Sequence, residues 1–402
     1  MLLSSPLHFK ASRNPGLSAV PDDKTGALRL ESLTSLRFFA AVMIVVNHTL
    51  GGFGLDPHSF FAVPLAQGVS FFFVLSGFIL THVYQNLGAG KPFLLFLCAR
   101  IARIWPVFFF SVCLMYIVSP KSMLATSATT TALVWISQAL LVHGWIPQRL
   151  YYFSLNAPSW SISTELFFYL AFPVLLLNLR RNYLATLVVV GLVTASLICL
   201  CHVCGLPLGG TETEMSRISR HGLLYINPLS RMLEFYVGML TYLLVSTKRS
   251  SSVPRSLLTI LEIVAIAAIV VTIVNVDNFT KLMGLDVTYP ELQLYLRYSG
   301  NMFGYAFLIA VVSFQRGCLS VLLKLPALVF LGEISYSIYL LHYSFMSVYE
   351  SQLSWHSAAS AIVRYAIFWA VLILAAAATY NLLEKPARNS LRKILSAGVD
   401  RL

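Results

Sequence analysis

Charged residues are scarce in this sequence. They make up 11% of its 402 residues, against about 25% in a water-soluble globular domain, while 57% are hydrophobic and the mean hydropathy is +0.76. This composition excludes a water-soluble globule. Segments with the alternating pattern of a β-barrel are absent, whereas long apolar runs recur. The sequence therefore predicts an all-α protein, a polytopic transmembrane helical bundle embedded in the lipid bilayer.

Metal-ligating and secretory signals are also sparse. The six cysteines lie mostly in apolar runs, which is typical of unpaired packing thiols. Cys201 and Cys204 form a single C-x-x-C pair, too little to indicate a metal, and we predict none. No cleavable signal peptide is evident, because residues 1–30 are polar, proline-containing and basic; we expect a disordered basic cytoplasmic tail. The net charge is +12, but the basic residues are distributed between the apolar runs as in a membrane protein. No nucleic-acid partner is therefore predicted.

Eleven apolar runs are long enough to consider as spans. The positive-inside rule is satisfied best when the fourth run does not fully cross, because most of the 28 basic residues then lie on the cytoplasmic side. We therefore predict about ten crossings, one partial or re-entrant helix at residues 130–145, and both termini in the cytoplasm. The candidate spans are residues 35–53, 64–85, 101–118, 130–145, 158–178, 183–203, 228–246, 257–275, 298–315, 327–349 and 360–383.

The first span carries two ionisable residues. In LTSLRFFAAVMIVVNHT, residues 33–49, Arg37 lies near the start and His48 near the end. Eleven positions give about 1100° of helical rotation, which puts both on one face about 16 Å apart along the axis. Ionisable groups inside a span are costly and indicate function. The structural alternative is an interfacial anchor at Arg37 and a packing residue at His48.

Two further segments could contact a ligand. Ser76, Gly77 and Phe78 lie within the second span, where small residues let a thin ligand or another helix approach closely. Arg100 and Arg103 share one helix face at the cytoplasmic start of the third span. Two guanidiniums so placed suit a phosphate or pyrophosphate. Taken alone, this RxxR pattern favours an anionic lipid headgroup.

The fifth span supplies a carboxylate at a depth similar to that of His48. Asn156 or Ser159 is expected to cap this helix, which places Glu165 about 10 Å into the membrane. A carboxylate bonded to one imidazole nitrogen fixes the tautomer and raises the basicity of the other, as in a histidine general base. We therefore predict that Glu165 orients His48. A structural buried pair is the alternative.

Two segments near the C-terminus also carry structural signals. In residues 330–346, Tyr336, Tyr339 and Tyr343 fall near one helix face and could line a cavity. After the last span, Pro386 and neighbouring basic residues predict a helix exit at the inner surface.

Taken in order, these segments resemble the acyltransferase 3 family of membrane acyltransferases, which modify polysaccharides, lipid-linked glycans and some antibiotics. The resemblance covers residues 31–390, the expected membrane domain, and leaves 391–402 as a cytoplasmic C-terminal tail. No hydrolase domain of the SGNH type is expected to follow. The best-matched parts are Arg37 with His48, GVSFFFVLSGF at 68–78, RIARIWP at 100–106, PSWSISTELFFYLAFP at 158–173, LGEISYSIYLLH at 331–342 and LLEKPAR at 382–388.

The resemblance implies an O-acyltransferase of the bacterial inner membrane. Its donor would be an acyl-CoA, most simply acetyl-CoA, and its acceptor a hydroxyl of a surface or exported polysaccharide or of a lipid-linked glycan precursor. His48 would be the general base, although a covalent acyl intermediate on His48 stays open. The donor would contact Arg37, Arg100, Arg103, Ser76, Gly77 and Phe78. The acceptor would contact Asn47, Trp160, Ser163, Tyr336 and His342.

Two other classes of protein remain open. One is a transporter or flippase that moves a lipid-linked glycan or another anionic solute. The other is a biosynthetic partner without catalysis of its own. Only the enzyme would consume a thioester, so an assay of thioester consumption distinguishes it from the transporter and from the non-catalytic partner.

Overall fold

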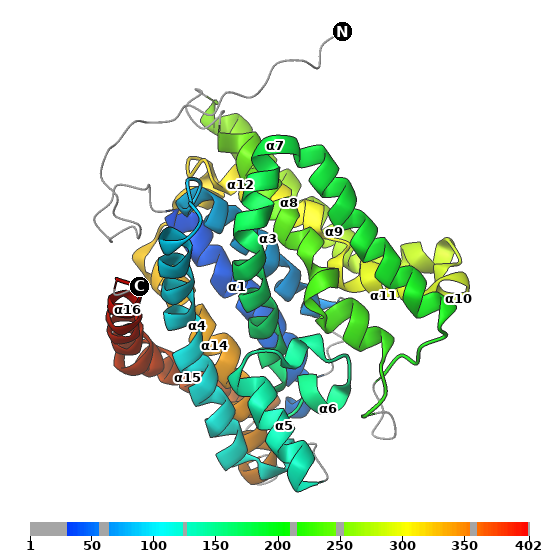
Figure 1. The fold of residues 1–402 in the computed structure, drawn as a ribbon, viewed down its shortest axis with the longest axis vertical. Coiled ribbons are helices and arrows are strands. Elements are labelled where there is room, and N and C mark those ends of the chain that lie inside the picture. Colours follow the sequence, from blue (N-terminus) through cyan, green and yellow to red (C-terminus); the bar gives the residue numbers. More distant parts are fainter. Residues whose placement is uncertain are drawn as a thin grey trace.

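The computed structural model describes residues 30–55, 64–123, 127–209, 215–246, 253–353 and 360–400, and these are helical throughout most of their length (Figure 1). The described residues contain no β-strand, only one isolated bridge between Gln148 and Ile218, so the all-α prediction is confirmed. Nearly all of the expected N-terminal tail, residues 1–29, lies outside them. The helices are α1 (Glu31–Thr49), α3 (Gly68–Val83), α4 (Lys91–Val118), α5 (Ala128–Ala139), α6 (Arg149–Tyr152), α7 (Trp160–Val203), α8 (Pro228–Ser246), α9 (Arg255–Leu282), α10 (Leu285–Thr288), α11 (Pro290–Ser299), α12 (Met302–Val312), α13 (Cys318–Leu322), α14 (Pro326–Val348), α15 (Ala361–Thr379) and α16 (Lys385–Asp400).

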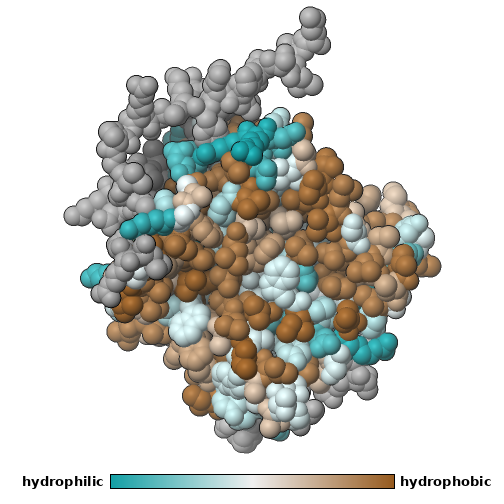
Figure 2. All heavy atoms as spheres, in the orientation of Figure 1, coloured by the Kyte–Doolittle hydropathy of each residue, from teal (hydrophilic) through white to brown (hydrophobic). Residues whose placement is uncertain are grey.

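Six helical stretches of the described chain are long and apolar enough to cross a membrane. Large apolar side chains on α9, α15 and the second half of α7 are exposed, as expected of surfaces that face lipid. Figure 2 shows apolar residues across the middle of one face, with hydrophilic residues toward its top and lower right. The prediction of about ten crossings and its sidedness are not tested by this geometry. The six stretches are Glu31–Phe53, Leu65–Val83, Lys91–Val118, Ala157–Val203, Arg255–Leu282 and Ala361–Val399.

Three expected spans, at residues 228–246, 298–315 and 327–349, are not among the six. Helix α12, in the second of these, has only 11 residues, whereas α8 and α14 carry polar residues. Both lie inside the bundle, where α8 packs against α3 and α14 packs against α1. On α8, Arg231 and Glu234 form a fully buried i, i+3 ion pair at 2.9 Å. Polar groups are tolerated at such depth when protein, rather than lipid, surrounds them. The central helices α1 and α3 are thus flanked by α14 and α8, and α4 contacts both α14 and α7 (Figure 1).

Helix α7 contains the fifth and sixth expected spans in one element. The break between them is at Asn182, whose backbone (φ −155°, ψ 83°) is not helical. Figure 1 shows α7 bending sharply at one end of the molecule. The expected boundary between residues 178 and 183 is therefore confirmed, although the connection has no loop.

The fourth run forms a short helix. Helix α5 has 12 residues, a length of about 18 Å, which is less than the hydrocarbon core of about 30 Å. The Ser127 side chain accepts a hydrogen bond from the Thr130 backbone N–H and so caps its start. Its length fits the predicted partial helix.

The expected helix exit near Pro386 is wrong. A π-helical turn, Tyr380–Glu384, joins α15 directly to α16, and the residues expected as a C-terminal tail are helical to Asp400. Helix α16 packs against α4, and this tertiary contact outweighs the local proline signal.

Candidate active site

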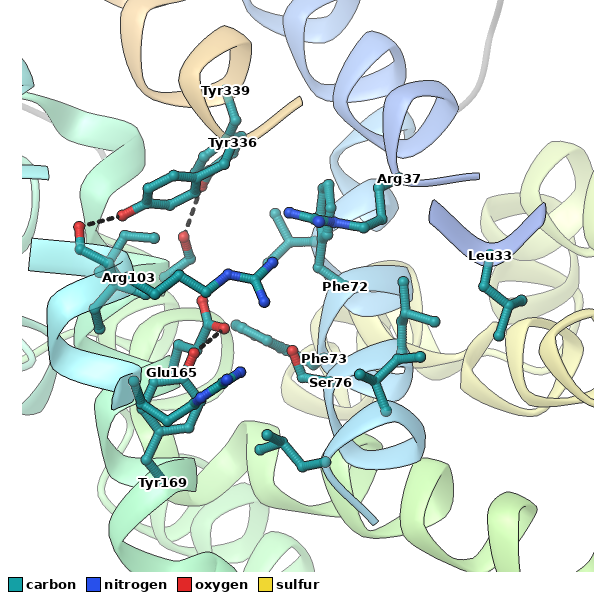
Figure 3. Close-up of a pocket in the computed structure, with 18 of the residues that line it drawn as sticks. Leu33, Arg37, Phe72, Phe73, Ser76, Arg103, Glu165, Tyr169, Tyr336 and Tyr339 are labelled. Carbon is teal, nitrogen blue, oxygen red and sulfur yellow. Dashed lines mark hydrogen bonds between the residues drawn. The ribbon is translucent and has the colours of Figure 1, made fainter. Parts of the chain in front are cut away.

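A cavity of about 210 Å³ opens between α1, α3, α4, α7 and α14. We call it the arginine cavity, because three guanidiniums line it. Figure 3 shows Arg37 and Arg103 extending into the same space from α1 and α4. The polar residues that line this cavity are Thr34, Arg37, Ser76, Arg100, Arg103, Ser161, Glu165, Tyr169, Tyr336 and Tyr339.

The arginines reach this cavity because of helix geometry. Arg100 and Arg103 lie one turn apart on α4, so they share a face. The Arg100 guanidinium donates a hydrogen bond to the Tyr84 hydroxyl at 3.0 Å and lies 5.3 Å from the centre of that ring. These contacts hold Arg100 at the cavity wall. The three arginines that were predicted to contact the donor therefore line one cavity.

Glu165 belongs to the arginine cavity. Its carboxylate accepts a hydrogen bond from the Tyr169 hydroxyl, one turn along α7, at 2.5 Å. Figure 3 places both residues beside Arg103. One carboxylate among three guanidiniums leaves the lining of this cavity with a net positive charge, which suits an anionic ligand.

A second cavity of about 540 Å³ contains His48. We call it the histidine cavity. The His48 side chain is exposed to it from the C-terminal end of α1. Aromatic and charged residues surround the space. The lining residues are His48, Met115, Ser119, Lys121, Arg149, Phe153, Leu155, Ala157, Pro158, Trp160, Tyr225, Tyr343, Met346, Ser347 and Glu350.

The partner of His48 is a second histidine. His48 Nδ1 lies 2.9 Å from Nε2 of His342, which is fully buried on α14. Within the described chain, Glu165 shares no hydrogen bond with His48 and lines the other cavity. The prediction that Glu165 orients His48 is therefore wrong. Two residues at a similar depth on two helices can still point in different directions, because depth does not determine the rotation of each helix about its axis. The rotation of α7 directs Glu165 toward the arginines.

Two of the three residues expected to contact a donor on α3 are packing residues instead. A Cβ at Gly77 would lie 1.9 Å from the Phe235 carbonyl oxygen, because α3 and α8 cross there in backbone contact. Phe78 is fully buried and packs edge-on against Tyr242. Of these three residues, only Ser76 lines the arginine cavity. The small residue at position 77 thus serves helix packing.

The expected acceptor residues are divided among several places. Trp160 lines the histidine cavity, whereas Tyr336 lines the arginine cavity and donates to the Ile104 carbonyl at 2.6 Å. Asn47 is exposed and lines neither cavity. Ser163 is buried and accepts a hydrogen bond from the Gly144 N–H, so it fixes a turn rather than a ligand. His342 contacts His48 rather than the cavity surface.

The two cavities adjoin at the start of α7. Trp160 lines the histidine cavity and the next residue, Ser161, lines the arginine cavity. The Tyr339 hydroxyl donates to the Pro158 carbonyl at 2.6 Å and lies 2.8 Å from Ser161 Oγ. Tyr339, which lines the arginine cavity, is therefore hydrogen-bonded to Pro158, which lines the histidine cavity.

Several residues that line the two cavities were not predicted from the sequence. Tyr169 could have been noticed, because it lies at i+4 from Glu165 on an inward helix face. Arg149, Lys121 and Glu350 lie in or beside short connecting segments, and only the fold brings them to His48. Tyr343 was expected on a cavity face and lines the histidine cavity.

Comparison with known proteins identifies the family. A family model described as an acyltransferase domain matches residues 30–380. The chain belongs to the acyltransferase 3 family. Among its relatives, acyltransferase MdmB of Streptomyces mycarofaciens is 29% identical over 238 residues, covering 55% of this chain and 58% of MdmB. O-acetyltransferase OatA of Staphylococcus aureus is 24% identical over 343 residues, covering 78% of this chain and 50% of OatA.

A third relative matches a shorter part. Protein 2 in the picA locus of Rhizobium radiobacter is 38% identical over 86 residues, covering 21% of this chain and 42% of that protein. The chain thus spans roughly half the length of the curated relatives it matches. No solved structure matches it.

Proposed function

We propose that this protein is a membrane O-acyltransferase that transfers acetyl from acetyl-CoA to a hydroxyl of a sugar. The observation that carries the proposal is one helix, α1, that contributes Arg37 to an anion-binding cavity and His48 to the adjoining cavity. A phosphate-bearing donor and a general base are the two components that acyl transfer from CoA requires. Family membership and the printed name of OatA, an O-acetyltransferase, agree with this chemistry.

The arginine cavity is the proposed donor site. Guanidiniums form bidentate, charge-assisted hydrogen bonds with phosphate oxygens, and CoA carries several phosphates. Three guanidiniums against the single Glu165 carboxylate leave the positive charge that such a ligand needs. We expect Glu165 and Tyr169 to hold the guanidiniums in place rather than to act on His48. By the predicted topology, this cavity faces the cytoplasm, where acetyl-CoA is made.

The histidine cavity is the proposed acceptor site. Trp160, Tyr225 and Tyr343 offer aromatic faces on which the apolar face of a sugar ring can pack. Its volume of about 540 Å³ accommodates a sugar residue of a larger glycan. We propose a surface or exported polysaccharide, or its lipid-linked precursor, as the acceptor, and the bacterial inner membrane as the location.

Transfer requires the thioester to reach His48. The pantetheine arm of CoA is thin, and the layer between the two cavities contains Ser161 and Tyr339, whose hydroxyl oxygens lie 2.8 Å apart. We propose that the arm passes between α3, α7 and α14 at this layer and presents its acetyl group to the histidine cavity. Movement of the Tyr339 side chain away from Pro158 would open the passage.

Free CoA release tests this function directly. Purified protein in lipid nanodiscs is incubated with labelled acetyl-CoA and glycan isolated from the source strain lacking the gene. The wild type should release CoA thiol and transfer label to the glycan. His48→Ala should slow both by about 10²–10⁴-fold, the usual contribution of a general base, while His202→Ala, whose imidazole pairs with Glu291 outside both cavities, should keep the wild-type rate.

Two results would overturn the proposal. Normal CoA release by His48→Ala would remove the catalytic role of His48. Failure to consume acetyl-CoA, together with movement of labelled glycan or anionic solute across vesicle membranes, would favour the transporter.

A further inference from the structure

We infer that His342 is the positioning residue that fixes the tautomer of His48 and leaves its Nε2 free to act as the base. The inference rests on the proposed function, because it assigns a role to a partner of the proposed base. It starts from a contact between two residues 294 positions apart in sequence, on α1 and α14.

The two rings are arranged for an in-plane hydrogen bond. Their planes are within 10° of each other and their centroids are 5.2 Å apart, while His48 Nδ1 and His342 Nε2 are 2.9 Å apart. Two nearly parallel rings joined edge to edge through nitrogens 2.9 Å apart have their centroids about this far apart, and the nitrogen–nitrogen distance is that of a hydrogen bond. One of the two nitrogens must therefore carry a proton and the other a lone pair.

The backbone decides which nitrogen carries the proton. His342 Nδ1 lies 2.6 Å from the carbonyl oxygen of Tyr339. A carbonyl can only accept, so His342 Nδ1 is the donor. His342 is fully buried and its hydrogen-bond partners within the described chain are a carbonyl and an imidazole. Burial without a carboxylate disfavours the charged form, so its Nε2 carries a lone pair.

The tautomer of His48 follows from that of His342. Since His342 Nε2 accepts, His48 Nδ1 carries the proton and donates it. His48 Nε2 is then the nitrogen with a free lone pair. Because His48 is exposed and lines the histidine cavity, this nitrogen is available to an acceptor hydroxyl. Tyr343 packs edge-on against both rings, with both centroid distances 6.4 Å, and keeps them together.

This chain of hydrogen bonds has a use in the reaction. The acceptor hydroxyl attacks the thioester carbonyl carbon while His48 Nε2 takes its proton. The resulting imidazolium keeps its Nδ1–H bonded to neutral His342, now as a charge-assisted hydrogen bond. When the carbon–sulfur bond breaks, the thiolate of CoA takes the proton from Nε2, giving CoA thiol and the ester. His342 transfers no proton in this sequence.

Two substitutions separate positioning from packing. His342→Phe keeps a planar ring but removes the acceptor, whereas His342→Gln places an amide oxygen near the position of Nε2 and can still accept from His48. We expect His342→Phe to lower kcat by about 10- to 100-fold, less than the loss of the base itself. KM for acetyl-CoA should change less than about twofold, and His342→Gln should recover most of kcat.

The matched control is Ser344→Ala on the same helix. Ser344 is buried, its hydroxyl has no hydrogen-bond partner within the described chain, and it lines neither cavity, so kcat should stay at the wild-type value. Equal losses in His342→Phe and His342→Gln, or none in either, would refute the positioning role.

Nitrogen-15 NMR of histidine-labelled wild-type protein tests the tautomer without any need for activity or for a variant to fold. We expect His48 with a protonated Nδ1 and an unprotonated Nε2. A protonated Nε2 in the wild-type protein would overturn the inference. An active His48→Ala enzyme would instead defeat the proposed function, so the two failures are distinguishable.

Discussion

At the scale of single residues, charge determines what the arginine cavity binds. If Arg37 and Arg103 contact CoA phosphates, replacing either with glutamine removes charge-assisted hydrogen bonds worth about 1.5–3 kcal/mol. CoA affinity should then fall by about 10- to 100-fold, as measured by calorimetric titration of CoA into protein in nanodiscs. The affinity should also become less sensitive to salt.

The control for this prediction is Arg316→Gln. Arg316 is exposed, lines neither cavity and carries the same charge. Replacing it changes the net charge of the protein by the same amount as replacing a cavity arginine. Because Arg316 is an exposed charge outside both cavities, CoA affinity should change by less than about twofold. Unchanged affinity in both cavity variants would show that these arginines do not hold the donor.

Individual site residues were predictable where one helix sufficed to place them. The face shared by Arg100 and Arg103, and the positions of Arg37 and His48 along α1, follow from helical periodicity. The partners were not predictable, because a pairing between helices depends on their rotation and crossing. Glu165 was assigned to His48 on depth alone, and Asn156, expected to cap α7, instead donates to Ser111 Oγ and to the Leu340 carbonyl.

At the scale of elements, the crossing of α3 and α8 depends on two glycines. A Cβ at Gly77 would lie 1.9 Å from the Phe235 carbonyl oxygen, and one at Gly238 would lie 1.9 Å from that of Val74. Both contacts are with backbone atoms, which cannot move aside as the end of a flexible side chain can. Gly77→Ala should therefore destabilise the protein by about 1–3 kcal/mol or more, the cost of overpacking.

Thermal unfolding in detergent measures this effect. Gly191→Ala on α7 is the matched control, since a Cβ there meets nothing within 4 Å, and alanine improves helix propensity by up to about 1 kcal/mol. Gly77→Ala should lower Tm while KM for acetyl-CoA stays near the wild-type value. A normal Tm with a raised KM would restore Gly77 to the donor site.

Element bounds were predictable where apolar runs end at polar residues, as for α1, α8 and α14. Two elements differed because tertiary contacts overrode local signals. Helix α16 continues past Pro386 because it packs on α4, and α7 passes from one predicted span to the next through the single non-helical residue Asn182.

At the scale of the whole molecule, the predicted topology places the two cavities toward opposite sides of the membrane. Ser32 and Ser35, at the start of α1, donate hydrogen bonds to the carbonyls of Ser320 and Leu323, so α13 lies at that end of α1. Cys318, the first residue of α13, should therefore be cytoplasmic. Cys204, after α7, should be outside.

Both cysteines are exposed, which makes them a matched pair for labelling. In intact spheroplasts of cells expressing single-cysteine variants, a membrane-impermeant maleimide should label Cys204 and leave Cys318 unlabelled until the membrane is opened. Labelling of Cys318 from outside would contradict the ten-crossing topology and the cytoplasmic position of the arginine cavity.

The central claim is that the arginine cavity holds the donor while His48 performs the chemistry next to it. Steady-state kinetics of CoA release, measured on Arg103→Gln and His48→Ala against varied acetyl-CoA, tests both halves together. Arg103→Gln should raise KM by about 10- to 100-fold and largely keep kcat, whereas His48→Ala should lower kcat by about 10²–10⁴-fold with little change in KM. An unchanged KM in the first variant or an unchanged kcat in the second would contradict the claim.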